Sequence, residues 1–135
     1  MYKNILVPVV FDEEHDSQAS YKAARTLADD DAKFTVLHVM ESIPAYVTAG
    51  IPAELLENSR KEIKSALIAA AAELPGSKAE LVSGHAGTTI VDYAKEHDVD
   101  CIVVASHVPG IANLLLGSTA DRVVRHAPCS VHVIR

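Results

Sequence analysis

The sequence predicts a single α/β domain built on an open five-stranded parallel sheet with helices on both faces. Short runs rich in β-branched residues alternate along the 135 residues with segments in which apolar residues recur at helical spacing. The short runs lack strict polar alternation, which is typical of strands covered on both faces. We therefore expect one domain over residues 1–135, with right-handed connections between its strands.

The first half of the chain shows this alternation in order. A first strand is expected in the apolar run Asn4–Val10. Pro8 is expected to mark the end of the strand, because proline in a central strand forfeits a ladder hydrogen bond. The first helix is expected at about Ser17–Asp29, where alanines and a leucine share one face. A second strand is expected at Phe34–Met40. The irregular segment Glu41–Gly50 then predicts a loop that could act as a lid.

The middle of the chain continues the pattern. A long helix is expected at about Pro52–Leu74, where leucines and isoleucines recur at helical spacing until Pro75-Gly76 stops it. The third strand is expected at Ala79–Ser83 and the third helix at about Thr89–His97.

The chain ends with a strand, a helix and a strand. The fourth strand is expected at Cys101–Ala105 and the last at Ser130–Ile134. Between them a helix is expected at about Ser118–His126, ending before Pro128.

Composition excludes several classes of protein. The net charge is −6 and no basic cluster occurs, so a nucleic-acid-binding surface is not expected. No apolar run reaches the ~18 residues of a membrane span, and the first residues do not form a signal peptide. Cys101 and Cys129 lie in or beside apolar runs without a CxxC pair, which is typical of reduced, buried thiols. These observations predict a cytoplasmic protein without membrane or nucleic-acid partners.

A binding site is expected where the strand order reverses. In open α/β sheets, ligands bind beyond the carboxyl ends of the strands at this point, here flanked by the first and fourth strands. The stretch Pro8-Val9-Val10-Phe11-Asp12 follows one, and Ala105-Ser106-His107-Val108 follows the other. Asp12 is close enough to reach a ribose hydroxyl, and His107 could donate to a phosphate. The seven histidines are otherwise scattered, with no pair three or four residues apart to bind a metal.

The start of the last helix is a candidate phosphate site. Gly117 permits close backbone approach, Ser118 and Thr119 carry hydroxyl donors, and unpaired N–H groups at a helix start attract anions. Two observations keep plain helix capping open as the alternative. Ser118 and Asp121 resemble a capping box, and the charge of Asp121 would repel a phosphate unless a metal intervened.

The common nucleotide motifs are missing. No G-x-x-x-x-G-K-[ST] occurs, and no G-x-G-x-x-G follows the first strand. A P-loop NTPase and an ordinary dinucleotide-binding fold are therefore not expected.

Three stretches resemble the universal stress protein family: "KNILVPV", "VLHV" and "LLLGSTADRVVRHAPCSVHVIR". The similarity covers nearly the whole chain and is most specific from Leu114 onward. It implies a Rossmann-like fold of the adenine nucleotide alpha hydrolase-like kind, with ATP, and Mg²⁺ with it, across the strand ends. The family's loop pattern is G-x-x-G, nine residues, then G-[ST].

The resemblance assigns binding positions to this sequence. Gly117 and Ser118 match the closing G-[ST], with Thr119 next to them. Val39 matches the residue that packs on adenine. The other positions that the resemblance implies are Pro8 and Val9 on the adenine side, Val104 before the loop, and Ser106 and His107 within it.

The sequence departs from the family pattern in three places. Ala105 and Val108 stand where the two glycines belong, and the spacing from Val108 to Gly117 is one residue short. The family aspartate after the first strand falls on Val10, for which Asp12 could substitute. The form S-H-x-P-x-I-x-x-x-L-L-G-S resembles a branch of the family in which some members bind ATP.

The function that the resemblance implies is an ATP-binding, nucleotide-dependent stress-response module, homodimeric through the last strand. A Val- and Ile-rich edge strand would otherwise be an aggregation hazard. Neither a positioned general base nor a nucleophile is seen, so at most slow hydrolysis or autophosphorylation is expected, with Ser118 or Thr119 as acceptor. The alternatives are a dimeric interaction module of the same family that has lost nucleotide binding, and a small hydrolase or flavin carrier on the same architecture.

Overall fold

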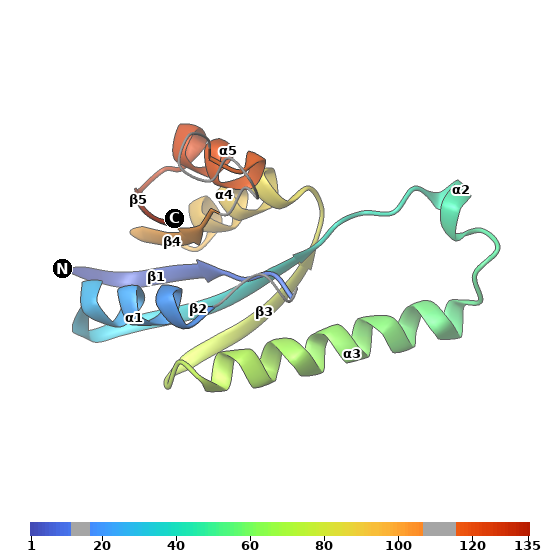
Figure 1. The fold of residues 1–135 in the computed structure, drawn as a ribbon, viewed down its shortest axis with the longest axis horizontal. Helices are drawn as coiled ribbons and strands as arrows, with labels where there is room; N and C mark the ends of the chain where they lie inside the picture. The colour runs from blue at the N-terminus through green and yellow to red at the C-terminus, as the bar shows by residue number, and fades with distance from the viewer. Residues whose placement is uncertain (12–16, 107–115) are drawn as a thin grey trace.

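The fold is an open, wholly parallel sheet of five strands with helices on both faces (Figure 1). The computed structural model describes residues 1–11, 17–106 and 116–135. The strand order is β3-β2-β1-β4-β5. The order reverses between β1 and β4, which are adjacent, as the sequence predicted.

The elements alternate regularly along the chain. The strands are β1 (Tyr2–Pro8), β2 (Ala28–Met40), β3 (Ser77–Ser83), β4 (Cys101–Ala105) and β5 (Ser130–Ile134). The helices are α1 (Ser17–Leu27), α2 (Ala45–Thr48), α3 (Ala53–Ala72), α4 (Ala86–Glu96) and α5 (Ser118–His126). The predicted bounds of β4, β5 and α5 are confirmed.

Several predicted boundaries were wrong. β1 begins at Tyr2, two residues before the expected run at Asn4–Val10, whereas its end at Pro8 is the one predicted from the proline. α4 begins at Ala86, three residues before the expected start. In the expected loop at Glu41–Gly50, the single turn of α2 forms.

The largest difference lies before the second strand. α1 stops at Leu27, and β2 begins at Ala28 and takes in three aspartates. Its register on β1 is irregular there, passing from Tyr2 opposite Ala28 to Asn4 opposite Lys33. Pairing with β3 begins only at Phe34. The predicted strand, Phe34–Met40, thus corresponds to the part of β2 that pairs with β3.

Two apolar layers cover the two faces of the sheet. α1 and α3 pack on one face around Tyr21, Ala24 and Leu67. α4 and α5 pack on the other around Ile90 and Val123. Figure 1 shows these helix pairs on opposite sides of the strands. Alternate residues of β1 and β4 point into each layer, so both central strands are buried on both faces.

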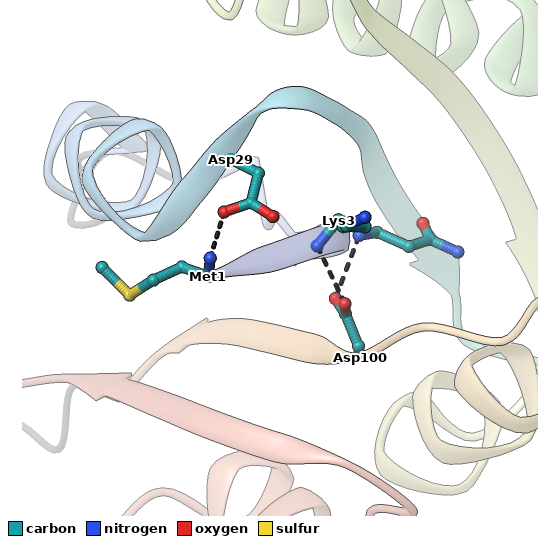
Figure 2. Close-up of polar contacts among 5 residues, drawn as sticks. Met1, Lys3, Asp29 and Asp100 are labelled. Carbon is teal, nitrogen blue, oxygen red and sulfur yellow. Dashed lines mark hydrogen bonds and ion pairs between the residues drawn. The ribbon is translucent and has the colours of Figure 1, made fainter.

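The amino end of β1 is held by side chains of other elements (Figure 2). Asp100, just before β4, accepts hydrogen bonds from the backbone N–H groups of Lys3 at 2.8 Å and Asn4 at 3.0 Å. The Asn4 side-chain amide donates to the carbonyl of His97 at 2.8 Å. The terminal ammonium of Met1 pairs with Asp29. Asp100 therefore fixes the β1–β4 pair, whose carboxyl ends carry the site described below.

The connection between β2 and α3, residues 41–52, and the first turns of α3 project beyond the carboxyl edge of the sheet (Figure 1). Their apolar side chains are exposed, including Tyr46 at 82% and Leu55 at 57%. Only the later turns of α3 bury residues, Leu67 and Ala71. The expected lid lies in this projection, and its movement stays a prediction.

Neither cysteine forms a disulfide. Cys101 is buried and Cys129 is half-buried. Over residues 1–11, 17–106 and 116–135, no helix has the length and apolar character needed to span a membrane.

Candidate functional site

A cavity of about 300 Å³ lies at the carboxyl ends of β1, β2 and β4, where the strand order reverses. It is also bordered by the starts of α1, α4 and α5. Ten lining residues are those that the sequence singled out: Pro8, Val9, Val10, Val39, Val104, Ala105, Ser106, Gly117, Ser118 and Thr119. The other two candidates, Asp12 and His107, lie outside the described residues. The structure thus brings four separate segments of the sequence to one cavity.

Sequence reasoning missed six lining residues, namely Ser17, Ser20, Leu37, Ala86, Ile90 and Ala120. Most of them come from helices, where residues facing a ligand and residues facing the core share the same periodicity. Ser20 offered a signal, because a serine stands among the alanines of a helix face that otherwise packs inward. It is 2% exposed.

The lining is apolar on the strand side and carries hydroxyls on the helix side. The strand ends contribute aliphatic side chains, including Val39 and Val104, and Ile90 of α4 adds to this surface. Hydroxyl groups come from α1, through Ser17 and Ser20, and from the start of α5. Such a cavity suits a flat apolar ring joined to a polar group.

The start of α5 is open to a ligand. Gly117 is the N-cap residue, with φ −62° and ψ 157°, and the helix has no side-chain cap. The alternative of a capping box formed by Ser118 and Asp121 is therefore wrong, since Ser118 is already the first helical residue. The backbone N–H of Asp121 donates to the carbonyl of Gly117 at 2.9 Å, which begins the helical ladder. The N–H groups of the three preceding residues stand before that ladder.

Asp121 repels a phosphate at the start of α5 less than the sequence predicted, because its charge is paired. Its carboxylate accepts hydrogen bonds from Nε of Arg125 at 3.0 and 3.1 Å, one turn along the helix. The arginine partner compensates the negative charge near the start of α5. The objection to a phosphate at this helix start is correspondingly weaker.

The start of α4 is occupied. A carboxylate oxygen of Glu41 accepts a hydrogen bond from the backbone N–H of Ala86 at 3.2 Å. A carboxylate thus already complements the start of α4, whereas the start of α5 at the same cavity has none. Of these two helix starts, that of α5 is the one left for an external anion.

Ser106 links the carboxyl end of β4 to α5. Its side-chain oxygen accepts a hydrogen bond from the backbone N–H of Gly117 at 2.8 Å, and its own N–H donates to the carbonyl of Ile134 at 2.7 Å. The residue is 8% exposed.

The backbone of Val9 is engaged by β2. Its N–H donates to the carbonyl of Leu37 at 2.8 Å, and its carbonyl lies 2.8 Å from Nδ1 of His38. The Nδ1–H tautomer makes this a hydrogen bond, and the ring of Phe11 packs 4.7 Å from that of His38. Val9 therefore offers packing surface and one remaining carbonyl lone pair to a ligand, while its N–H is already used.

The described part of the lining contains no ionisable side chain. Among the described residues, N–H and hydroxyl groups are the ones that can hold an anion there. Outside the cavity, burial raises the pKa of Cys101 to about 11, so this thiol stays protonated and is a poor nucleophile. In residues 1–11, 17–106 and 116–135, no three His, Cys, Asp or Glu side chains gather to hold a metal ion.

Comparison with known proteins places these features in a family. A sequence model of the universal stress protein family matches residues 1–135. Universal stress protein A homolog 2 of Coxiella burnetii is 33% identical, over 99% of this chain and 95% of that protein.

Solved structures agree with this match. The universal stress protein UspA of Lactobacillus plantarum superposes with a TM-score of 0.71 and 33% identity, over 99% of this chain and 98% of the other. The universal stress protein of Archaeoglobus fulgidus in complex with dAMP has a TM-score of 0.66 over 99% and 98% of the two chains. At 20% identity, that structure shows the shared fold.

Proposed function

Because the chain belongs to the universal stress protein family, we propose that it binds an adenine nucleotide, ATP foremost, in the cavity at the strand ends. In this proposal it acts in the cytoplasm as a nucleotide-dependent stress-response module. The single observation that carries the proposal is the contrast between the two helix starts. The start of α4 has Glu41 as its anion, whereas the start of α5 faces the same cavity uncapped.

The phosphate binds at the start of α5. Ser118 and Thr119 supply hydroxyl groups, and the N–H groups of Ser118, Thr119 and Ala120 supply donors that precede the helical ladder. The positive end of the helix dipole adds to these contacts, in a site without an ionisable side chain among the described residues. The pairing of Asp121 with Arg125 leaves this end of the helix accessible to negative charge.

The adenosine part packs on the strand ends. Val39, half-buried at the end of β2, offers an aliphatic surface to a face of the purine ring, with the buried Leu37 and Ile90 behind it, and Pro8 borders the cavity from β1. The dAMP complex of the Archaeoglobus fulgidus protein shows that a protein of this fold accommodates an adenine nucleotide. A hydroxyl of α1, from Ser17 or Ser20, is available to the ribose.

The described residues do not provide a protein-held Mg²⁺ site. No carboxylate lines this part of the cavity, and Mg²⁺ in proteins usually takes one or two carboxylates besides phosphate oxygens. A Mg²⁺ ion accompanying ATP would be held by the nucleotide's own oxygens, water and the hydroxyls of Ser118 or Thr119. We accordingly expect AMP to need no Mg²⁺ for binding.

The protein acts by binding rather than by turnover. None of the described lining side chains is a general base, and the buried thiol of Cys101 lies outside the lining. Any phosphoryl transfer is slow and incidental, with Ser118 or Thr119 as acceptor.

A homodimer through β5 is part of the proposal. β5 is an edge strand, paired only with β4 in the described chain. Its free side would pair with the same strand of a second copy, which removes an exposed edge.

One observation favours a second candidate, a dimeric interaction module without nucleotide. The N–H of Val9, which the family resemblance places beside adenine, is already bonded to Leu37. The two candidates predict different ligand responses.

A thermal-unfolding titration separates them. AMP, ATP and ATP with Mg²⁺ are each added to the purified protein up to millimolar concentration. A ligand at ~100 times its dissociation constant stabilises the fold by about 2.7 kcal/mol, which raises the melting temperature by roughly 10 °C for this chain length. No shift with any adenine nucleotide, together with a persistent dimer, supports the second candidate and contradicts the first.

The variant Gly117→Val supplies the control. The backbone of Gly117 has ordinary angles that valine adopts without strain, so the fold should survive while the side chain obstructs the phosphate position. Gly50→Val is the matched change away from the cavity, where an added Cβ has no atom within 4 Å. The nucleotide response should disappear in the first variant and remain in the second.

A further inference from the structure

We propose that Ser106 is the positioning residue of the phosphate end: its hydroxyl oxygen holds Gly117 in place, and its hydroxyl proton is donated to the phosphate. The inference rests on the proposed nucleotide function and assigns a distinct physical role within that site. It depends on the contacts of one buried side chain.

Ser106 is itself fixed by the sheet. It directly follows β4, and its N–H donates to the carbonyl of Ile134 at 2.7 Å, next to the pair formed by Ala105 and Ile134. The residue is 8% exposed and lines the cavity. Because its backbone is fixed against β5, the serine holds the group that its side chain contacts at a fixed position relative to β4 and β5.

That contact is the N-cap residue of α5. The backbone N–H of Gly117 donates to the Ser106 oxygen at 2.8 Å, across eleven positions of sequence. Gly117 has no side chain with which to fix itself, and no side chain caps the helix. The serine therefore sets where the first N–H groups of α5 stand relative to the sheet.

The Ser106 hydroxyl can also donate a hydrogen bond to the phosphate, because accepting one from Gly117 leaves its proton free. A serine hydroxyl has one proton to donate and two lone pairs to accept with. Since the Gly117 N–H occupies a lone pair, the proton of Ser106 points elsewhere, and the described structure shows no protein acceptor for it. A phosphate oxygen at the start of α5 would be that acceptor, in a charge-assisted hydrogen bond.

The same contact removes Gly117 from the direct phosphate ligands. Its N–H is already donated to Ser106, so the phosphate is left with the N–H groups of Ser118, Thr119 and Ala120. Gly117 then lets the phosphate approach the backbone closely and attaches the start of α5 to Ser106, but it donates no hydrogen bond to the phosphate.

The test compares AMP with adenosine in Ser106→Ala and Ser106→Thr. Loss of the hydroxyl should weaken AMP roughly 10- to 100-fold, because a hydrogen bond to a charged group is lost. Adenosine, which has no phosphate, should bind Ser106→Ala as it binds the wild type. Ser106→Thr keeps the hydroxyl and should restore most of the AMP affinity.

Amide hydrogen exchange at Gly117 measures the contact without ligand. The exchange rate should rise at least ~10-fold in Ser106→Ala, which corresponds to about 1.4 kcal/mol, and stay low in Ser106→Thr. Ser77→Ala is the matched control. The Ser77 hydroxyl donates to the carbonyl of Ala71 at 2.7 Å, at the amino end of β3, and its loss should leave both readouts unchanged.

Each contrary result has its own meaning. Unchanged Gly117 exchange in Ser106→Ala would show that the serine does not hold the helix start. Equal weakening of AMP and adenosine would show a general structural role in place of a phosphate role. If the wild type binds neither ligand, the proposed function itself fails and the phosphate role fails with it, whereas the exchange experiment still reports the contact.

Discussion

Asp100 is expected to be a main anchor of the β1–β4 pair on which the cavity depends. Its carboxylate accepts from two consecutive backbone N–H groups, those of Lys3 at 2.8 Å and Asn4 at 3.0 Å (Figure 2). Asp100→Ala removes both acceptors at once. Hydrogen bonds to a charged group contribute about 1.5–3 kcal/mol each when buried.

Solvent exposure of the two hydrogen bonds reduces the stability that Asp100 contributes. The contact with Lys3 is exposed and that with Asn4 is part-buried, so water replaces part of the loss. We expect Asp100→Ala to lower the free energy of unfolding by about 2 kcal/mol, or the melting temperature by roughly 7 °C for 135 residues. Asp100→Asn keeps one acceptor oxygen and should lose about half as much.

Urea unfolding followed by circular dichroism measures this difference. Asp92→Ala is the matched control, because it removes an exposed carboxylate from α4 and should change stability by less than about 0.5 kcal/mol. If Asp100→Ala and Asp92→Ala were equally stable, the anchoring role of Asp100 would be refuted.

Three further predictions concern the core, the helix packing and the projecting segment. Burial raises the pKa of Cys101 from 9.0 to about 11. Between these two values the folded state keeps a proton that the unfolded state releases. The free energy of unfolding should therefore be unchanged by this group below pH 9 and should fall by roughly 2–3 kcal/mol between pH 9 and 11. Unfolding curves over this range should show a smaller fall in Cys101→Ala, and an identical fall would contradict the assignment. Gly87→Ala should lower the free energy of unfolding by about 1–3 kcal/mol, because the added Cβ would lie 2.9 Å from the side chain of Arg122 in α5. Gly50→Ala is the control, because an added Cβ there has no atom within 4 Å. Equal melting temperatures of the two variants would contradict this packing of α4 against α5. Leu67→Ala should lower the free energy of unfolding by about 2–5 kcal/mol, because Leu67 is 1% exposed. Leu55→Ala should lower it by less than about 0.5 kcal/mol, because Leu55 is 57% exposed. A large loss of stability in Leu55→Ala would mean that the start of α3 is covered.

The sheet was predictable because its strands are continuous apolar runs. β4 and β5 were predicted with their observed bounds: β4 is a buried apolar run, and β5, which has no buried residue, is rich in valine and isoleucine and directly follows Pro128 and Cys129. The acidic start of β2 was not predictable. Asp29 to Asp31 have no apolar pattern, and the strand extends through them only because β1 lies alongside. α2 was missed because a single turn has no periodicity to detect.

The site was predictable in its location and less so in its contacts. The reversal of strand order, which follows from the fold class, is enough to place both Val9 and Ser106 beside one crevice. Partners could not be predicted, because they depend on distances between remote segments. The sequence could not show that Glu41 occupies the start of α4, 45 residues further along the chain. The pairing of Asp121 with Arg125, by contrast, joins residues four apart on one predicted helix and could have been predicted from that spacing.

The most direct test of the account is a nuclear magnetic resonance titration of the isotope-labelled protein with AMP. On addition of AMP, the backbone amide resonances of Ser118, Thr119 and Ala120 should shift most, because these groups receive the phosphate, and adenosine should shift them far less. Shifts centred on Ala86 at the start of α4, or no shift at millimolar AMP, would contradict this expectation.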